Sequence, residues 1–183
     1  EAMVTPTQGR SGKVIATGGL SDLAQESVTN ISAVVKKLTG KDIQDYDLHV
    51  QFPGTHNVDG DSASITMATA IISAFEGVPI DQNLAMTGSL SVRGEVLPIG
   101  GVSAKIEAAV KSGIERVIIP RSNQQDVLID EKYESQVEII PVDSLDEVLQ
   151  HALVGAEEKV SLVERLANVV DTISSGPDSQ PSA

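Results

Sequence analysis

The chain has 183 residues, of which 40% are hydrophobic, so it is long enough for one domain with a buried core and too short for two. A formal net charge of −13, without a cluster of Lys and Arg, argues against a surface that attracts nucleic acid. The chain contains no cysteine, which excludes a disulfide framework and a thiolate metal site and makes a cytoplasmic setting the default expectation.

Residues 1–12 are rich in turn-forming residues, so we expect a flexible entry segment there. Because the chain does not begin with Met, we expect its first residues to be a vector-derived remnant. A phosphate-binding P-loop has four residues between its glycines, whereas Gly9 and Gly12 have two between them. The sequence therefore predicts a linker here rather than a nucleotide site. No signal peptide is recognisable, and the longest apolar run is too short for a membrane span of about 20 residues.

The first part of the chain predicts two strands and a helix. Residues 14–17 have the pattern of a short strand, and Ser21 suits the cap of a helix that ends at Gly40. Alternating apolar and polar residues over 48–52 predict a half-buried strand, which leads into a loop of turn-formers at 53–61. Apolar residues recur with helical spacing between Ser21 and Gly40, namely Ala24, Val28, Ile31, Val35 and Leu38.

The later part of the chain predicts shorter elements in alternation. They are a hairpin (84–90 with 95–97), a helix (102–113), two strands (116–119 and 137–140), a helix to about residue 153 opened by a capping box at 144–147, and an amphipathic helix (160–173). A polar tail at 175–183 is expected to be disordered. This order of elements predicts a single α/β or α+β domain over residues 13–174.

A nearly all-apolar helix follows the loop at 53–61. Only hydroxyl side chains interrupt its apolar residues as far as Phe75, and an element that is apolar on all faces is buried in a domain. Ser62, within Gly-Asp-Ser-Ala-Ser at 60–64, therefore lies at the amino end of a buried helix, where free N–H groups could hold an oxyanion. On this stretch alone, a simple capping role for Asp61 or Ser62 is the favoured interpretation.

A second stretch, at residues 93–105, argues against the interpretation of Ser62 as a simple helix cap. It contains a Pro-Ile-Gly-Gly turn at 98–101 and places Lys105 43 positions after Ser62. Together the two stretches resemble the proteolytic domain of Lon proteases in its archaeal, membrane-anchored form, in which a Gly-Asp-Ser nucleophile precedes a Pro-Ile-Gly-Gly turn and a catalytic lysine. Bacterial members carry Pro-Ser-Ala-Gly where this chain has Asp-Ser-Ala-Ser, which indicates the subtype. The resemblance covers residues 14–153.

The resemblance implies that Ser62 attacks a peptide carbonyl to form an acyl-enzyme and that Lys105 removes its proton. An unperturbed lysine pKa near 10.4 leaves about one lysine in a few thousand neutral at pH 7, so the base needs its pKa lowered by roughly 2–3 units. Without this pairing, Lys105 would be interpreted as a solvated helix lysine like Lys111. We expect the pKa shift to come from desolvation by apolar neighbours, namely Val102, Ile106, Ala108 and Ala109.

Three further residues are expected to support the dyad. By resemblance, Thr87 hydrogen-bonds the catalytic lysine, and we favour this role over that of an ordinary threonine at a strand end. A carboxylate beside Lys105, from Asp59 or Asp61, would raise the lysine pKa and oppose base catalysis. Our hypothesis is that Asp59 pairs with Lys105 in a resting state and moves aside when substrate or neighbouring subunits order the loop. Archaeal relatives often carry Glu at the position of Asp59.

The resemblance also implies partners outside this chain. In the full-length protein, an AAA+ module would use ATP and Mg²⁺ to unfold damaged proteins and feed them to a ring of six such domains, tethered to the cytoplasmic face of the membrane. For this chain itself we expect no cofactor, no metal, no nucleic acid and no direct membrane contact.

Other interpretations remain open. His56 is close to Ser62 in sequence, so a Ser-His-Asp triad is a less favoured alternative, while His49 and His151 fall in an ordinary strand and helix. A metal mechanism is less favoured still, because the sequence has no spaced cluster of His, Asp and Glu. The main rival is a non-catalytic assembly or substrate-binding domain of the same fold. A second rival is a Ser-Lys hydrolase of another bond, such as an amide or a β-lactam.

Overall fold

The computed structural model describes residues 1–7, 9, 11–54, 59–155 and 164. Its elements, in chain order, are β1 (Ala2–Pro6), β2 (Val14–Thr17), α1 (Asp22–Thr39), the 3-10 helix η1 (Ile43–Asp45), β3 (Tyr46–Gln51), α2 (Ser64–Glu76), β4 (Leu84–Met86), β5 (Ser89–Leu90), β6 (Val96–Leu97), α3 (Val102–Lys111), β7 (Arg116–Pro120), the 3-10 helix η2 (Arg121–Asp126), α4 (Glu131–Glu134), β8 (Glu138–Val142) and α5 (Leu145–Ala152).

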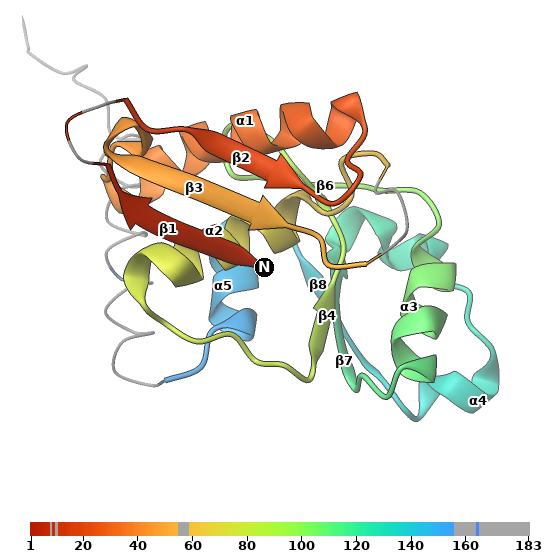
Figure 1. Cartoon of the computed structure of the whole chain (residues 1–183). Helices are drawn as coiled ribbons and strands as arrows, with labels where there is room; N and C mark the ends of the chain where they lie inside the picture. Colours follow the sequence, from red (N-terminus) through yellow and green to blue (C-terminus); the bar gives the residue numbers. More distant parts are fainter. Residues whose placement is uncertain (8, 10, 55–58, 156–163, 165–183) are drawn as a thin grey trace, which may run out of the picture.

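The strands of the described residues form small separate sheets rather than one large sheet. In the first sheet, β3 lies between β1, which is antiparallel to it, and β2, which is parallel. In the second, β7 lies between β4 and β8, and all three strands are parallel. The short strands β5 and β6 form an antiparallel pair. Figure 1 shows the first sheet on one side of the molecule and α3 and α4 on the other, with β4, β7 and β8 between them.

The helix α2 lies at the centre of the core. Most of its apolar side chains are buried because it packs against α1, β1 and α5, as expected for a helix without a polar face. Gly77 ends α2 in the left-handed conformation with a φ of 69°. The mixed α/β fold with a buried central helix is therefore as predicted. The buried apolar residues of α2 are Ile65, Met67, Ala68, Ile71 and Ile72.

Predictions that rest on local signals agree with the structure. The Ser21 hydroxyl accepts from the Ala24 N–H at the start of α1, and Gly40 ends this helix with a φ of 69°. The five apolar residues predicted along α1 are all buried. At α5, the Ser144 hydroxyl accepts from the Glu147 N–H, but the Glu147 carboxylate accepts from the N–H of residue 143, so only one half of the predicted capping box forms.

Two predictions about strands are wrong. Residues 2–6 form the edge strand β1 instead of a flexible entry, because Ala2 and Val4 pack on the core and the whole segment pairs with β3. The predicted hairpin strand at 84–90 is divided between two sheets. Its first part, β4, pairs with β7, and only β5 forms the hairpin with β6.

The amphipathic helix predicted at 160–173 and the tail at 175–183 lie outside the described residues, apart from residue 164. In the part of the chain that the structure describes, no helix is both long enough and apolar enough to cross a membrane.

Candidate active site

The side chains of Ser62 and Lys105, which are 43 positions apart in the sequence, meet in the structure. The Lys105 Nζ lies 2.8 Å from the Ser62 Oγ and 3.3 Å from the Thr87 Oγ1. The Thr87 hydroxyl in turn donates to the Ser62 carbonyl oxygen at 3.2 Å. One ammonium or amine group is therefore within hydrogen-bonding distance of two hydroxyls, with the Ser62 hydroxyl the nearer.

Ser62 lies in a tight turn immediately before α2. The helix begins at Ser64, and its N-cap residue, Ala63, has no side chain able to cap it. The Asp61 carbonyl accepts from both the N–H and the hydroxyl of Ser64, which closes the turn. A capping role for the side chains of Asp61 and Ser62 is therefore wrong, and the Ser62 hydroxyl faces Lys105 instead of the helix backbone.

The segment that joins β4 to β5 holds this turn from one side. The Gly88 N–H donates to the Ser62 carbonyl at 2.8 Å, and the Gly88 carbonyl accepts from the Ile65 N–H at 3.2 Å. The Thr87 N–H donates to the Ile118 carbonyl of β7 at 3.0 Å, so the same segment is tied to the parallel sheet. These backbone bonds fix the turn relative to the sheet.

Lys105 projects from the end of the first turn of α3, and the apolar residues of this helix set its position. Val102 and Ile106 are buried against Val117 and Ile119 of β7, and Lys105 lies on a neighbouring face of the helix. Gly101 begins the helix with a φ of 69°, a conformation that glycine adopts without strain.

Asn123 positions the turn that leads into α3, a role that the sequence did not predict. Its side chain is buried, its Oδ1 accepts from the Ile99 N–H at 2.8 Å, and its Nδ2 donates to the Ile99 carbonyl at 3.0 Å and to the Asp126 carboxylate at 2.9 Å. An asparagine side chain has both donors and an acceptor, so it can satisfy the N–H and the C=O of Ile99 in the way that a neighbouring strand would. No local pattern marks this role, because the partners are 24 positions apart.

Burial lowers the pKa of the Lys105 ammonium below its ordinary value, and the negative charge of Asp61 acts in the opposite direction. The direction agrees with the expected desolvation. The predicted set of apolar neighbours of Lys105 is wrong in one member, because Ala108 is exposed on α3.

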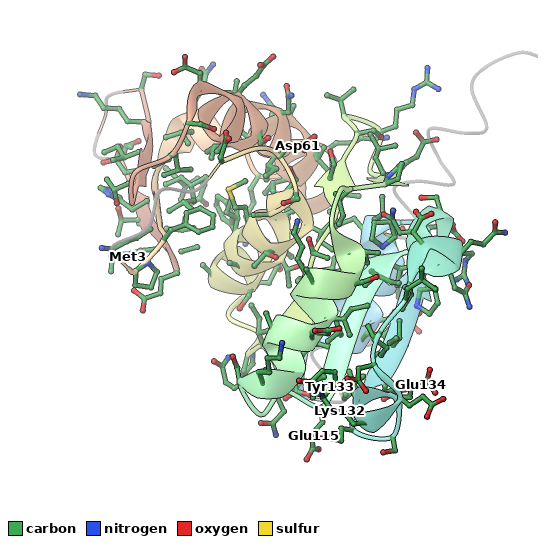
Figure 2. All side chains as sticks on the ribbon, turned by 90° about the vertical axis from the view of Figure 1, so that its right-hand side faces the viewer. Met3, Asp61, Glu115, Lys132, Tyr133 and Glu134 are labelled. Carbon is green, nitrogen blue, oxygen red and sulfur yellow. The ribbon has the colours of Figure 1, made fainter. Side chains whose placement is uncertain are left out.

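The two aspartates before Ser62 occupy different positions. The Asp61 carboxylate accepts from the Ser89 hydroxyl at 2.6 Å, and Figure 2 shows Asp61 where the loop before α2 approaches the β5–β6 hairpin. The Asp59 carboxylate accepts from the N–H of Gly60 at 2.8 Å. Among the described residues no ion pair joins Asp59 to Lys105, so the carboxylate that acts electrostatically on Lys105 in this structure is that of Asp61.

The structure gives no support to a histidine triad. His49 and His151 are exposed on β3 and α5, and among the described residues the hydrogen-bond partner of the Ser62 hydroxyl is Lys105, not a histidine. His56 lies outside the described residues. Over the described ranges, no group of three or more His, Asp or Glu side chains is arranged to hold a metal ion.

Comparison with known proteins gives one consistent result. Residues 1–155 match the family model of the Lon protease C-terminal proteolytic domain. The chain is similar to the archaeal Lon proteases of Thermoplasma acidophilum (52% identical over 172 residues, 93% of this chain and 26% of that protein), Archaeoglobus fulgidus (55% over 166 residues, 90% and 27%) and Halobacterium salinarum (56% over 171 residues, 92% and 24%). It therefore spans about a quarter of the length of these relatives.

The match includes both stretches that carry the predicted resemblance and also β1, the segment predicted from the sequence to be a flexible entry. Identity above one half with archaeal proteases agrees with the predicted archaeal subtype. The chain belongs to the Lon protease C-terminal proteolytic domain family.

Proposed function

We propose that this chain is a serine endopeptidase domain that cleaves unfolded proteins, with Ser62 as the nucleophile and Lys105 as the general base. The observation that carries the proposal is the 2.8 Å contact between the Lys105 Nζ and the Ser62 Oγ. Two side chains so distant in sequence meet here beside a buried helix terminus, and a lysine whose pKa is lowered by burial is able to act as a base.

The chemistry follows from this contact. The neutral Lys105 amine accepts the Ser62 proton while the Oγ forms a bond to the substrate carbonyl carbon. The resulting ammonium gives the proton to the leaving amine as the C–N bond breaks, which leaves an ester on Ser62. A water molecule then attacks the ester carbon and Lys105 accepts its proton. As the C–O bond of the ester breaks, Lys105 gives this proton to the Ser62 Oγ, so that the hydroxyl is restored and the acid leaves.

The tetrahedral intermediate carries an oxyanion that needs hydrogen-bond donors. The backbone N–H groups of Ser62 and Ala63 stand at the amino end of α2, and neither has an acceptor among the described residues. Free N–H groups and the helix dipole both favour negative charge at this place. We assign the oxyanion site to them, as an electrostatic contribution to catalysis.

Thr87 orients the lysine in this proposal. Its side chain is only 7% exposed, and its hydroxyl lies between the Lys105 Nζ and the Ser62 carbonyl. A hydroxyl held at both ends limits the rotation of the amine and keeps it directed at the nucleophile.

The activity of the whole protein is a wider proposal, since this chain is about a quarter of its relatives' length. We propose that an AAA+ module in the same protein unfolds substrates with ATP, that six such domains form a ring, and that the assembly is tethered to the membrane. We assign ATP and Mg²⁺ to that module, because Gly9 and Gly12 are too close together for a P-loop and the described part of this chain has no group of three acidic or histidine side chains that could hold a metal. No step of the dyad chemistry passes through them.

The experiment is cleavage of a casein-like unfolded protein across pH, together with labelling by a serine-reactive phosphonate mapped by mass spectrometry. The wild type should label at Ser62, and both Ser62→Ala and Lys105→Ala should lose cleavage and labelling. Lys111→Ala, on the exposed face of α3, and Ser112→Ala, at its end, are the matched controls and should keep both. A wild-type chain that takes no phosphonate on Ser62 at any pH contradicts the proposal.

The same experiment separates the rival functions. A non-catalytic binding domain would not label at Ser62. A Ser-Lys hydrolase of another bond would label but would turn over small amides or β-lactams in preference to unfolded protein.

A further inference from the structure

A second hydroxyl on the segment at 87–89 contacts the site, and the dyad chemistry does not use it. The Ser89 Oγ donates to the Asp61 Oδ2 at 2.6 Å, a short bond of the kind that hydroxyls make with charged carboxylates. Ser89 is only 6% exposed, although its partner Asp61 is an exposed residue. A buried serine thus bonds the exposed carboxylate of the residue that precedes the nucleophile.

The placement of this carboxylate matters because Asp61 is the residue immediately before Ser62. Its negative charge stabilises the Lys105 ammonium, which is the protonation state that cannot act as a base. An aspartate side chain that turned toward Lys105 would form an ion pair at close range and strengthen this effect. The described residues contain no such ion pair, and the carboxylate is bonded to Ser89 instead.

Ser89 is well fixed to hold the carboxylate in place. It pairs with Leu97 in the β5–β6 hairpin, and the preceding Gly88 is bonded through its backbone to both Ser62 and Ile65. The backbone of Ser89 is therefore held in place, and its hydroxyl can move only by rotation of its own short side chain. The Asp61 carboxylate is thus bonded to a residue of strand β5 whose backbone is fixed.

Other groups that face Lys105 do not compensate for a misplaced carboxylate. From the turn before α2 come the Ser62 hydroxyl and the Asp61 carboxylate, and from the β4–β5 segment comes the neutral Thr87 hydroxyl. The Asp59 carboxylate is bonded to a backbone N–H of its own loop. Asp61 is thus the one charged group of the described residues that acts on the lysine.

We propose that Ser89 is a positioning residue that keeps the Asp61 carboxylate directed toward β5 and away from Lys105, so that the lysine remains available as a base. The inference rests on the proposed function, because it concerns the base of the Ser62–Lys105 dyad. It predicts that removing the Ser89 hydroxyl changes the pH at which the enzyme becomes active, through the charge of Asp61.

The test is the rate of phosphonate labelling of Ser62 as a function of pH in the wild type and in Ser89→Ala. In Ser89→Ala the Asp61 carboxylate is free to turn toward Lys105, which should raise the pH at which labelling reaches half of its maximal rate by about one unit, since a close opposite charge shifts a pKa by about 1–3 units. Below the midpoint, labelling should be about tenfold slower, and the plateau at high pH should be unchanged. Ser89→Thr keeps the hydroxyl and should restore the wild-type midpoint.

Two further variants show whether the effect passes through the charge of Asp61. Asp61→Asn should lower the midpoint, and the double variant with Ser89→Ala should have the same profile as Asp61→Asn alone, because no charge remains to be misplaced. Ser64→Ala is the matched control. It removes a bond to the Asp61 backbone carbonyl instead of the carboxylate, so it should leave the midpoint unchanged even where the loosened turn slows labelling at every pH.

The outcomes separate this inference from the function on which it rests. An unshifted midpoint in Ser89→Ala, with normal labelling of the wild type, overturns the inference alone. So does an equal shift in the Asp61→Asn background, which would mean that Ser89 acts by another route. A wild type that never labels at Ser62 overturns both.

Discussion

Gly88 has no room for a side chain, and this gives a quantitative test of how closely the segment at 87–89 packs against the turn that carries Ser62. A Cβ added there would lie 3.0 Å from the Ile65 Cδ1 and 3.1 Å from the Val96 Cγ1, with the Ile65 Cγ2 at 3.4 Å. Comfortable contact between carbon atoms is about 3.5–4.0 Å, so two neighbours must each move by a few tenths of an ångström. Ile65 is fully buried and Val96 is 8% exposed, so neither has free space to enter.

Gly88→Ala is therefore an overpacking substitution, which costs about 1–3 kcal/mol. For a domain of this size that lowers the melting temperature by about 2–12 °C. The added methyl also pushes the 87–89 segment away from Ser62. A displacement of about 1 Å at a catalytic group costs about 100-fold, so a few tenths of an ångström should slow phosphonate labelling of Ser62 about tenfold.

The matched control is Gly100→Ala, because a Cβ at Gly100 meets no atom within 4 Å and its backbone does not have a left-handed φ. Thermal unfolding and the labelling rate of both variants should be measured at the same pH. If Gly88→Ala melts and labels like Gly100→Ala, the segment is not packed against the nucleophile turn as described, and the reasoning fails.

Four other changes test the site. Thr87→Val should slow labelling of the nucleophile about tenfold by freeing the lysine, and Thr87→Ser should not; equal rates in the two variants would argue against an orienting hydroxyl. Asn123→Ala leaves the N–H and C=O of Ile99 without their partner and should lower the free energy of unfolding by about 1–3 kcal/mol, whereas an unchanged denaturation midpoint would refute this role. Lys105→Met should unfold at a higher denaturant concentration than the wild type at neutral pH, because a lysine whose pKa is lowered in the folded state destabilises the fold while it is charged. The difference between the two denaturation midpoints should shrink as the pH rises toward 10.5, where the lysine loses its charge in the unfolded state as well. A difference that stays constant with pH would contradict burial of the charge as its cause. Asp59→Asn should leave the midpoint of the pH profile unchanged, since its carboxylate bonds to its own loop, and a clear downward shift would instead support the resting ion pair with Lys105.

The agreement between sequence and structure is best where a signal is local. Ser21 and Gly40 delimit α1 because a hydroxyl cap and a left-handed glycine act within a few residues. The burial of α2 followed from its own composition, because a helix that is apolar on all faces has no stable exposed state. The same stretch alone favoured a capping role for Ser62, which the helix start at Ser64 excludes.

The strands were harder to predict because their partners are distant. Residues 2–6 carry only a weak alternating pattern and become β1 through pairing with β3, whose residues are 40 to 48 positions away. The stretch at 84–90 looks continuous, yet Thr87 and Gly88 bond to β7 and to the turn before α2, which divides it between two sheets. A strand's partner is a property of the assembled core and is not visible in the segment itself.

For the site, the sequence by itself determined the identities and spacing of Ser62 and Lys105 and the kind of chemistry that two such residues support. Only the tertiary structure decided that their polar atoms meet, that Asn123 holds the turn before α3, and that Ser89 holds the carboxylate of Asp61. These contacts join residues 24 to 43 positions apart, and their energies depend on geometry that no local pattern records.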